Sequence, residues 1–339
     1  MKVAFITYQY PPKHLWGGSF YAYKLTHALE DLGIDVVRIG PSSMCDKGIK
    51  ISASNLLHFA WKAAKHVGRT DLVHGNILGD LFITKKPCVT TMHHPMKYDF
   101  PQNSFKKIAY LWMERKCFRK AKAVITDSQL ARQEFINLYG NESKIYSIPS
   151  GVDPVKKPRL GDSCKVLCAT GLGPRKGLEL ALHAAQCLAE HSVEFYITGD
   201  GAEKKHLESL AAHMKLKNIH FLGAVTREKL EVLYSECGIC LITSTYEGFG
   251  LPILEGMAHK KVVITTNTGI APEAIENGKS GFILEERDPN LIASIIMKLI
   301  KDKALFRKLA LNAYTTSKKF TWGNTAKKTI EIYETALSE

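Results

Sequence analysis

The sequence lacks the long apolar runs of a membrane-spanning protein and the polar bias of a disordered one. Its longest hydrophobic segments are strand-sized, which excludes a candidate transmembrane helix. Met1 to Thr7 is typical of a strand rather than of a signal peptide, so we expect a cytoplasmic protein. With 45% hydrophobic residues, the 339-residue chain can bury a core in each of about two domains.

No arrangement of cysteines indicates a disulfide framework or a metal site. The eight cysteines are scattered through apolar segments such as 165–169, which is typical of reduced thiols in a core. Cys237 and Cys240 have C-x-x-C spacing but lead into a strand without a second ligand pair, which disfavours a zinc or redox role. No Asp-x-Asp lies in a context that suggests a divalent cation. We therefore expect neither a metal nor another cofactor.

Acidic residues are scarce between positions 85 and 122, where ten Lys and Arg accompany only Asp99 and Glu114. The net charge is +13, and residues 1–155 hold nine units of this surplus. The stretch 104–122 is predicted to form a basic helix with an apolar stripe of Phe105, Ile108, Leu111, Trp112 and Phe118. We expect the stripe to pack on a sheet, while the basic face is either solvated or binds an anionic membrane surface or a lipid phosphate. No nucleic-acid motif accompanies the charge, so no nucleic-acid partner is expected.

Short apolar runs alternate with longer periodic segments along the chain, which is the pattern of parallel sheets wrapped by helices. The first domain is expected at 1–153 and the second at 164–319, because 154–163 has two prolines and the polar composition of a linker. The predicted strands of the first domain are 3–7, 36–39, 72–74, 88–92, 123–126 and 144–148. Those of the second domain are 165–169, 193–198, 219–222, 238–243, 262–265 and 282–284.

The stretch 244–259 reads S-T-Y-E-G-F-G-L-P-I-L-E-G-M-A-H and predicts a tight glycine loop, entered from a strand and followed by a helix. Pro252 lies where the first helical residue is expected. The loop glycines tolerate φ > 0 and can turn backbone N–H groups outward, and the helix start adds its positive dipole end. Glu247 in the loop and Glu255 one turn into the helix then face one crevice. Acceptor carboxylates beside a nest of donors suit a phosphorylated, polyhydroxylated ligand such as a sugar nucleotide.

Glu247 and Glu255, eight positions apart around Gly-Phe-Gly-Leu-Pro, resemble the signature of the retaining glycosyltransferases of glycosyltransferase family 4. The resemblance implies the GT-B fold, in which two Rossmann-like domains with parallel sheets face each other across a cleft. It also implies a C-terminal helix, here about 320–339, that crosses back to the N-terminal, acceptor-binding domain. The implied activity belongs to glycan biosynthesis. It is retaining, metal-independent transfer of a sugar from a nucleotide diphosphate sugar to a glycan, lipid-linked or small-molecule acceptor.

The first turn of the second domain, 170–177, resembles the diphosphate-binding segment of the family. Lys176 matches the family's lysine, and Arg175 is a second cation beside it. Backbone amides and basic side chains are what a diphosphate requires. The turn departs from the pattern at Leu172, where the family has an arginine, and Arg175 is the candidate to replace that arginine.

Further donor contacts are implied around these residues. The segment 221–225 resembles the family's nucleobase-binding segment, where backbone groups hold the base, and this assigns Gly223 and Val225 to the donor site. The segment 199–201 is interpreted as a structural turn. The implied donor site is completed by Gly248, Phe249, Gly250 and Leu251.

In the first domain, Gly17 and Gly18 open the first predicted helix, with Ser19 as its expected N-cap. The resemblance implies that the loop ending at these glycines lies against the donor diphosphate and the acceptor, as suits the helix end of a doubly wound domain. His93, with His94 as the alternative, follows the fourth strand, and the resemblance implies a position near the reacting centre.

Catalytic roles follow for three residues. Lys176 is expected to stabilise the charge of the leaving diphosphate, and Glu247 to bind sugar hydroxyls and the positive charge at the anomeric carbon. His93 is expected to bond a sugar hydroxyl or the departing phosphate, while Glu255 binds the ribose hydroxyls. Asp127, followed by a serine, is interpreted first as part of a helix start and second as an acceptor contact. The resemblance favours front-face attack, in which a donor phosphate oxygen takes the acceptor's proton.

Two other classes of function are compatible with the pattern. One is another GT-B enzyme, such as a phosphorylase or a nucleotide-sugar epimerase, and a requirement for a second sugar acceptor separates a transferase from these. The other is a non-catalytic protein that binds a nucleotide sugar or a polyanion. The presence of Glu247, Glu255 and Lys176 together favours an enzyme.

Overall fold

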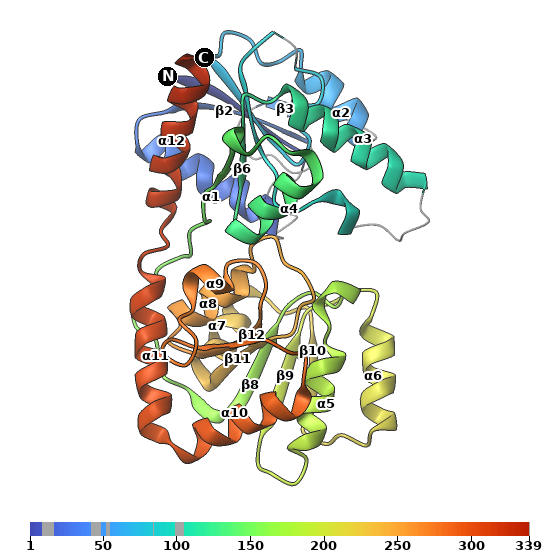
Figure 1. Ribbon diagram of the computed structural model, residues 1–339, viewed down its shortest axis with the longest axis vertical. Coiled ribbons are helices and arrows are strands. Elements are labelled where there is room, and N and C mark those ends of the chain that lie inside the picture. The colour runs from blue at the N-terminus through green and yellow to red at the C-terminus, as the bar shows by residue number, and fades with distance from the viewer. Residues whose placement is uncertain (9–16, 42–48, 52–54, 84, 99–104, 339) are drawn as a thin grey trace. The chain divides into compact units, whose positions relative to one another are not determined.

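The computed structural model describes residues 1–8, 17–41, 49–51, 55–83, 85–98 and 105–338. The chain forms two compact units: residues 1–151 with 321–339 make the first, and residues 152–320 make the second (Figure 1). The expected α/β class with two parallel-sheet domains is confirmed. The chain leaves the first unit after Gly151 and returns to it after Phe320, and the N–H of Val152 donates to the carbonyl of Phe320 at 3.0 Å.

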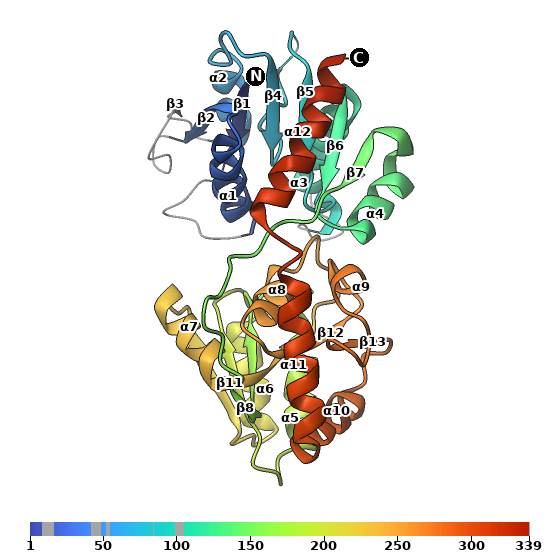
Figure 2. The same cartoon turned by 90° about the vertical axis from the view of Figure 1, so that its left-hand side faces the viewer.

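The first unit contains a seven-stranded sheet in which every neighbouring pair is parallel (Figure 2). The strand order is β3-β2-β1-β4-β5-β6-β7. The strands are β1 (Lys2–Thr7), β2 (Asp35–Pro41), β3 (Ile49–Ile51), β4 (Leu72–Asn76), β5 (Cys88–Thr91), β6 (Ala123–Thr126) and β7 (Ile145–Ser147). The sequence pattern does not predict β3, because three residues are too few to show a period.

Helices cover both faces of this sheet, which is why its strands are apolar on both sides. On one face, α1 (Gly17–Asp31) and α12 (Trp322–Ser338) pack against each other and share a core with Val3 and Phe5 of β1. α1 begins at Gly17, so the expectation that Ser19 is its N-cap is wrong: Ser19 is a buried residue of the first helical turn.

The alternate residues of β1, Ala4 and Ile6, belong to the cores of the opposite face, as the period of two in a strand requires. The helices that contribute to these cores are α2 (Leu56–Ala63), α3 (Phe105–Lys120) and α4 (Gln129–Tyr139). Ser128 caps α4 by accepting the N–H of Ala131 at 3.1 Å, so the helix start expected there is confirmed. Short 3-10 turns are η1 (Met96–Tyr98) and η2 (Glu142–Lys144).

Helix α3 has apolar residues on two opposite faces. Its inner face buries Met113, Cys117 and Phe118 in the core of the unit. The expectation that the whole apolar stripe packs on the sheet is wrong, because three of its members point to solvent. The exposed fractions are 89% for Phe105, 68% for Ile108 and 57% for Trp112.

The second unit contains a six-stranded parallel sheet with the order β10-β9-β8-β11-β12-β13. Its strands are β8 (Asp162–Ala169), β9 (Glu194–Thr198), β10 (Ile219–Gly223), β11 (Cys237–Ile242), β12 (Val262–Thr266) and β13 (Phe282–Leu284). β8 begins at Asp162, so it includes the last two residues of the segment expected to be a linker.

One face of this sheet is covered by α5 (Glu179–Cys187), α6 (Lys204–His213), α10 (Pro289–Lys301) and much of α11 (Lys303–Ser317). The other face is covered by α7 (Arg227–Glu236), α8 (Leu251–Ala258) and α9 (Ala271–Ala274). A 3-10 turn, η3 (Pro174–Lys176), lies between β8 and α5.

The strand order reverses between β1 and β4 in the first unit and between β8 and β11 in the second. At such a switch point the loops after two neighbouring parallel strands run in opposite directions, and ligands of open α/β sheets bind in the space that this leaves. In the second unit the loops in question follow β8 and β11. These are the two segments in which the sequence places its diphosphate turn and its paired glutamates.

Candidate active site

The two loops at the switch point of the second unit are joined through their backbones. The carbonyl of Lys176 accepts the hydroxyl of Thr243 at 2.9 Å, and the carbonyl of Arg175 accepts the N–H of Thr245 at 2.7 Å. Gly177 adopts φ +54°, a left-handed conformation that suits glycine and closes the turn. The diphosphate turn and the glutamate loop are therefore one structural element.

Lys176 and Glu247 lie in direct contact. The ammonium Nζ of Lys176 is 2.6 Å from Oε1 of Glu247, and the hydroxyl of Ser244 donates to the same oxygen at 2.6 Å. Glu247 is only 8% exposed, so its charge is held by these two partners rather than by water. The structure thus brings together two of the three residues to which the sequence assigns catalytic roles.

The loop after Glu247 ends in the expected helix. Gly250 has φ +82° and precedes α8, which begins at Leu251, so Pro252 is the second helical residue and not the first. Gly250 is in the left-handed region as expected, but Gly248 is not. The side chain of Phe249 is largely buried in the core of the unit, and its carbonyl accepts the N–H of Ile270 at 2.7 Å.

Glu255, the fifth residue of α8, is held by two side chains from α7. Arg227 Nη1 lies 2.7 Å from its Oε1, and the buried hydroxyl of Tyr234 donates to its Oε2 at 3.3 Å. Burial raises the pKa of Tyr234 well above its ordinary value, with the Glu255 carboxylate as the next cause. Burial alone would lower the pKa of Arg227, but the carboxylates of Glu255 and Glu231 raise it.

The sequence motifs do not identify Arg227 or Tyr234. Arg227 and Tyr234 are seven positions apart, which is two helical turns, in the helix that directly follows the segment 221–225. This spacing places them on one face of the helix and is the signal in the sequence that could have identified them. Gly223 ends β10 with φ +67°, and its carbonyl accepts the N–H of Gly199 at 2.7 Å. The segment expected to hold the nucleobase therefore leads through Val225 into α7, the helix whose side chains bind Glu255.

In the first unit, His93 lies between two acceptors. Its Nδ1 is 2.5 Å from Oδ2 of Asp127, and its Nε2 is 2.8 Å from Oδ1 of Asn76. The amide of Asn76 is oriented by its own donation to the carbonyl of Gly18 at 3.2 Å and to the hydroxyl of Thr7 at 3.1 Å. Both ring nitrogens of His93 therefore have a hydrogen-bond partner within the first unit.

Gly18 lies close to the His93 ring. A Cβ there would lie 2.7 Å from Cδ1 of Ile77 and 3.3 Å from the His93 ring, so a side chain would require Ile77 and the histidine to shift. Gly17, at the exposed start of α1, has open space around its Cα. Asn76 at the end of β4 joins the glycines to the histidine, and the motifs do not single it out.

A second buried network lies beneath His93. The ring of His74 is hydrogen-bonded to the hydroxyl of Tyr333 at 2.5 Å and to that of Thr91 at 2.7 Å, and Thr91 is 3.2 Å from the hydroxyl of Tyr21. The Tyr21 ring packs edge-on against His93, with centroids 4.9 Å apart. Burial lowers the pKa of His74 to about 3, so this histidine is neutral at physiological pH.

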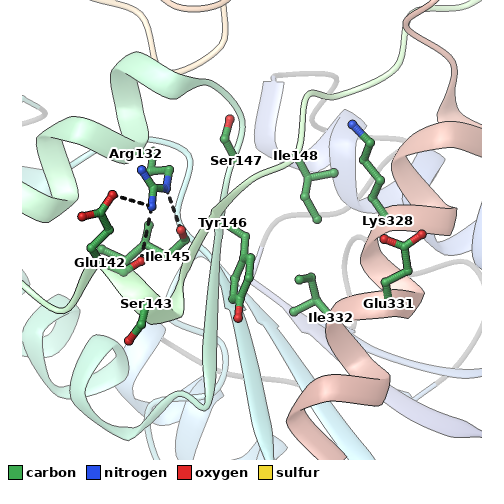
Figure 3. A pocket seen from close by; sticks show the side chains of 10 residues that line it. All are labelled: Arg132, Glu142, Ser143, Ile145, Tyr146, Ser147, Ile148, Lys328, Glu331 and Ile332. Carbon is green, nitrogen blue, oxygen red and sulfur yellow. Dashed lines mark hydrogen bonds and ion pairs between the residues drawn. The ribbon is translucent and has the colours of Figure 1, made fainter.

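A pocket of about 390 Å³ lies elsewhere in the first unit, beside the edge strand β7 and helix α12 (Figure 3). Its lining includes Arg132, whose guanidinium donates to the carbonyl of Ile145 at 2.7 Å and to Glu142 at 3.1 Å. None of the predicted site residues lines it. Arg132 and Glu142 in this pocket are paired with each other.

The residues that the structure describes include neither a metal-binding cluster nor a membrane-spanning helix. No three His, Cys, Asp or Glu side chains there cluster in a way that could hold a metal ion. Within the same residues, every helix is too short or too polar to cross a membrane.

Solved structures with the same architecture extend over the whole chain. Sucrose-phosphate synthase from Thermosynechococcus elongatus superposes with a TM-score of 0.82 at 21% identity and covers 99% of both chains. The Anabaena protein HepE, solved in complex with UDP-glucose, superposes with a TM-score of 0.81 at 21% identity and covers 100% of both chains. The two parallel-sheet units therefore have the GT-B fold.

Both units also match glycosyltransferase domain families. Residues 17–156 match the family described as Glycosyltransferase Family 4, and residues 153–316 match Glycosyl transferases group 1. An uncharacterized glycosyltransferase of Methanocaldococcus jannaschii is 24% identical over an alignment that covers 99% of both chains. The chain is therefore a glycosyltransferase with the GT-B fold, built from a family 4 type domain followed by a group 1 domain.

Proposed function

We propose that this glycosyltransferase moves a sugar from a nucleotide diphosphate sugar to an acceptor with retention at the anomeric carbon and without a metal ion. The observation that supports this most directly is the Lys176–Glu247 ion pair at the switch point of the second unit. A diphosphate would replace Glu247 as the partner of Lys176, and the released carboxylate would then be available to the sugar hydroxyls. Once the pair separates, Lys176 is the cation for the leaving diphosphate and Glu247 is the anion for the sugar.

The remaining donor contacts follow from the same unit. Arg175 and the amides between Gly248 and Leu251 supply positive potential for the phosphate oxygens, which is the role a divalent cation has in other transferases. Glu255, oriented by two side chains of α7, accepts the ribose hydroxyls. Backbone groups of Gly223 and Val225 are assigned to the base.

The first unit is assigned to the acceptor and the reacting sugar. His93 can donate an N–H to a sugar hydroxyl or to a departing phosphate oxygen, provided the ligand displaces Asn76 or Asp127 from one ring nitrogen. Gly17 leaves room for a ligand at the start of α1, and Gly18 allows the His93 ring to lie beside it. The acceptor class is a glycan, a lipid-linked intermediate or a small molecule, and the transfer is assigned to glycan biosynthesis in the cytoplasm.

The outer face of α3 supports attachment to an anionic membrane surface. Phe105, Ile108 and Trp112 recur at helical spacing and are largely exposed. Basic residues of the same face, Arg115, Lys116 and Arg119, follow them on the helix. Exposed aromatic and aliphatic side chains among cations are typical of helices that lie on an anionic lipid surface.

Vesicle binding tests the membrane assignment. The protein should sediment with vesicles that contain phosphatidylglycerol but not with phosphatidylcholine alone, and the double variant Phe105→Gln/Trp112→Gln should lose this binding. Trp61→Gln is the matched control, because Trp61 on α2 is 50% exposed and has Lys65 over its ring. Equal binding by the double variant and the wild type would refute the assignment.

A thermal-shift panel of UDP, GDP, ADP and CMP sugars tests the proposed function itself. A ligand at 100 times its dissociation constant should stabilise the protein by about 2.7 kcal/mol, and the shift should disappear in Glu255→Ala. Product formed only when a second sugar acceptor is present would separate a transferase from an epimerase. Stabilisation without turnover in the presence of acceptors would favour a non-catalytic binding protein.

A further inference from the structure

The diphosphate turn has an apolar residue, Leu172, where the family resemblance implies an arginine. The side chain of Leu172 is 2% exposed and belongs to the core of the second unit. Its backbone is fixed on both sides, because its N–H donates to the carbonyl of Asp200 at 2.9 Å and its carbonyl accepts the N–H of Glu203 at 2.9 Å. A side chain at this position cannot reach the surface of the turn without leaving the core, so any replacement cation has to come from another position, either Arg175 in the same turn or a residue of another segment.

A guanidinium reaches the turn from the loop between β13 and α10. Nη1 of Arg287 donates to the carbonyl of Thr243 at 2.7 Å. Nη2 lies so close to the bare Cα of Gly177 that a Cβ there would collide with it. Gly177 directly follows Lys176, and Thr243 directly precedes Ser244, the partner of Glu247. Arg287 therefore lies against both loops of the switch point.

Arg287 has no anionic partner among the described residues, unlike Lys176 and Arg227 of the same unit. Lys176 is paired with Glu247, and Arg227 is paired with Glu255. Two acidic residues flank Arg287 in the sequence, and neither forms an ion pair with it: Glu286 is exposed, and Asp288 accepts the N–H of Asn290 at 2.9 Å and so caps α10. Arg287 is an exposed residue, and the partial burial of its guanidinium lowers its pKa.

The guanidinium keeps most of its hydrogen-bonding capacity. A guanidinium has five N–H donors in a planar fork, and the carbonyl of Thr243 uses one nitrogen of Arg287. This fork matches the geometry of phosphate oxygens, to which arginine binds bidentately. An unpaired guanidinium fixed against a phosphate-binding turn is suited to an anion that is not part of the protein.

We infer that Arg287 is a donor-binding residue that supplies to the diphosphate the cation missing at Leu172. This inference rests on the proposed function, because it concerns the ligand of the same site. The positive charge of Arg287 attracts the diphosphate, and its hydrogen bond to the carbonyl of Thr243 positions the guanidinium. Two substitutions separate these effects. Arg287→Lys keeps the charge, and Arg287→Gln removes the charge but keeps an N–H donor for the carbonyl.

Isothermal titration of the full chain with UDP, GDP and ADP, and with the corresponding monophosphates, tests the inference. For the diphosphate that the wild type binds best, we expect Arg287→Gln to weaken binding about tenfold to a hundredfold and Arg287→Lys to weaken it less. The corresponding monophosphate should bind Arg287→Gln within about threefold of its affinity for the wild type. Arg307→Gln, an exposed arginine of α11, is the control and should bind both ligands like the wild type.

Three outcomes would count against the inference. Wild-type affinity of Arg287→Gln for the diphosphate would overturn it. An equal loss for monophosphate and diphosphate would also overturn it, because Arg287 would then only support the shape of the turn, and the melting temperatures of the unliganded variants would show that change independently. If the wild type bound no nucleoside diphosphate at all, the proposed function would fail and the inference with it, which is distinguishable from the first two results.

Discussion

The hydroxyl of Tyr333 lies 2.5 Å from Nδ1 of His74, so the last helix of the chain is bonded to the middle of the first sheet. Both side chains are fully buried. Because His74 is neutral, the four members of the network from Tyr333 to Tyr21 can each donate one proton and accept another. Such a network is costly to break at any one member, since its neighbours are then left buried without a partner.

Tyr333→Phe should destabilise the first unit by about 1–3 kcal/mol, because His74 would lose a buried hydrogen bond with no water to replace it. Urea unfolding followed by circular dichroism measures the change. Tyr314→Phe is the matched control, since that hydroxyl contacts the carbonyl of Val155 at 3.4 Å and is only partly buried. A loss no larger than that of the control would show that the Tyr333 bond contributes little.

The free energy of unfolding should decrease in acid because His74 becomes protonated when the chain unfolds. Its pKa is about 3 in the folded protein and 6.5 for a free histidine, so the unfolded chain binds a proton that the folded chain excludes. The stabilisation is complete above pH 6.5 and is lost as the pH falls from 6.5 towards 3, by at most about 1.4 kcal/mol per pH unit. His74→Gln should flatten the pH dependence of unfolding in this window. The same slope in wild type and variant would assign the acid sensitivity to other groups.

Glu247→Gln should separate binding from transfer. The neutral amide no longer competes for Lys176, so a free nucleoside diphosphate should bind as tightly as to the wild type or more tightly. Sugar transfer should fall by at least about a hundredfold, because the carboxylate for the anomeric charge is gone. Calorimetry and a transfer assay measure the two effects. Parallel loss of both would show that Glu247 supports the diphosphate site instead of releasing it.

Asp127→Asn should lower kcat about 10- to 100-fold with a smaller effect on the KM of the donor. The carboxylate holds the His93 ring at 2.5 Å, and an amide could present an N–H to a nitrogen that already carries a proton. Steady-state kinetics with both substrates varied measures this. Ser150→Ala removes the hydroxyl 3.2 Å from the other Asp127 oxygen and is the control. A change in donor KM alone would place Asp127 outside the chemical step.

Much of the fold could be predicted because strands of a parallel sheet are buried on both faces and read as continuous apolar runs. Val3 and Ala4 point to opposite faces of β1, yet both enter a core. The same reasoning failed for α3. Its sequence has apolar residues on both sides, and periodicity alone does not tell which side the rest of the chain covers.

The candidate site was predictable where the motif lies within one segment, as for Glu247 and Glu255. It was not predictable where a contact joins distant segments. Asn76, Arg227 and Arg287 are ordinary polar residues in the sequence, and only the fold brings them to His93, Glu255 and Gly177. The role of each depends on the atoms that it contacts in the folded chain, and the sequence does not show these contacts.

The chain crosses between the two units twice, after Gly151 and after Phe320, and this has a practical consequence for engineering. Val152 and Phe320, the first and last residues of the second unit, are hydrogen-bonded to each other, so that unit begins and ends at one place. A Cβ on Gly151 would collide with the backbone of Trp322, so the two ends of the first unit also meet. The gene segment for 152–320 is therefore a cassette that can be cut out whole. A short glycine bridge from Gly151 to Thr321 would close the remaining 170 residues into a separate domain.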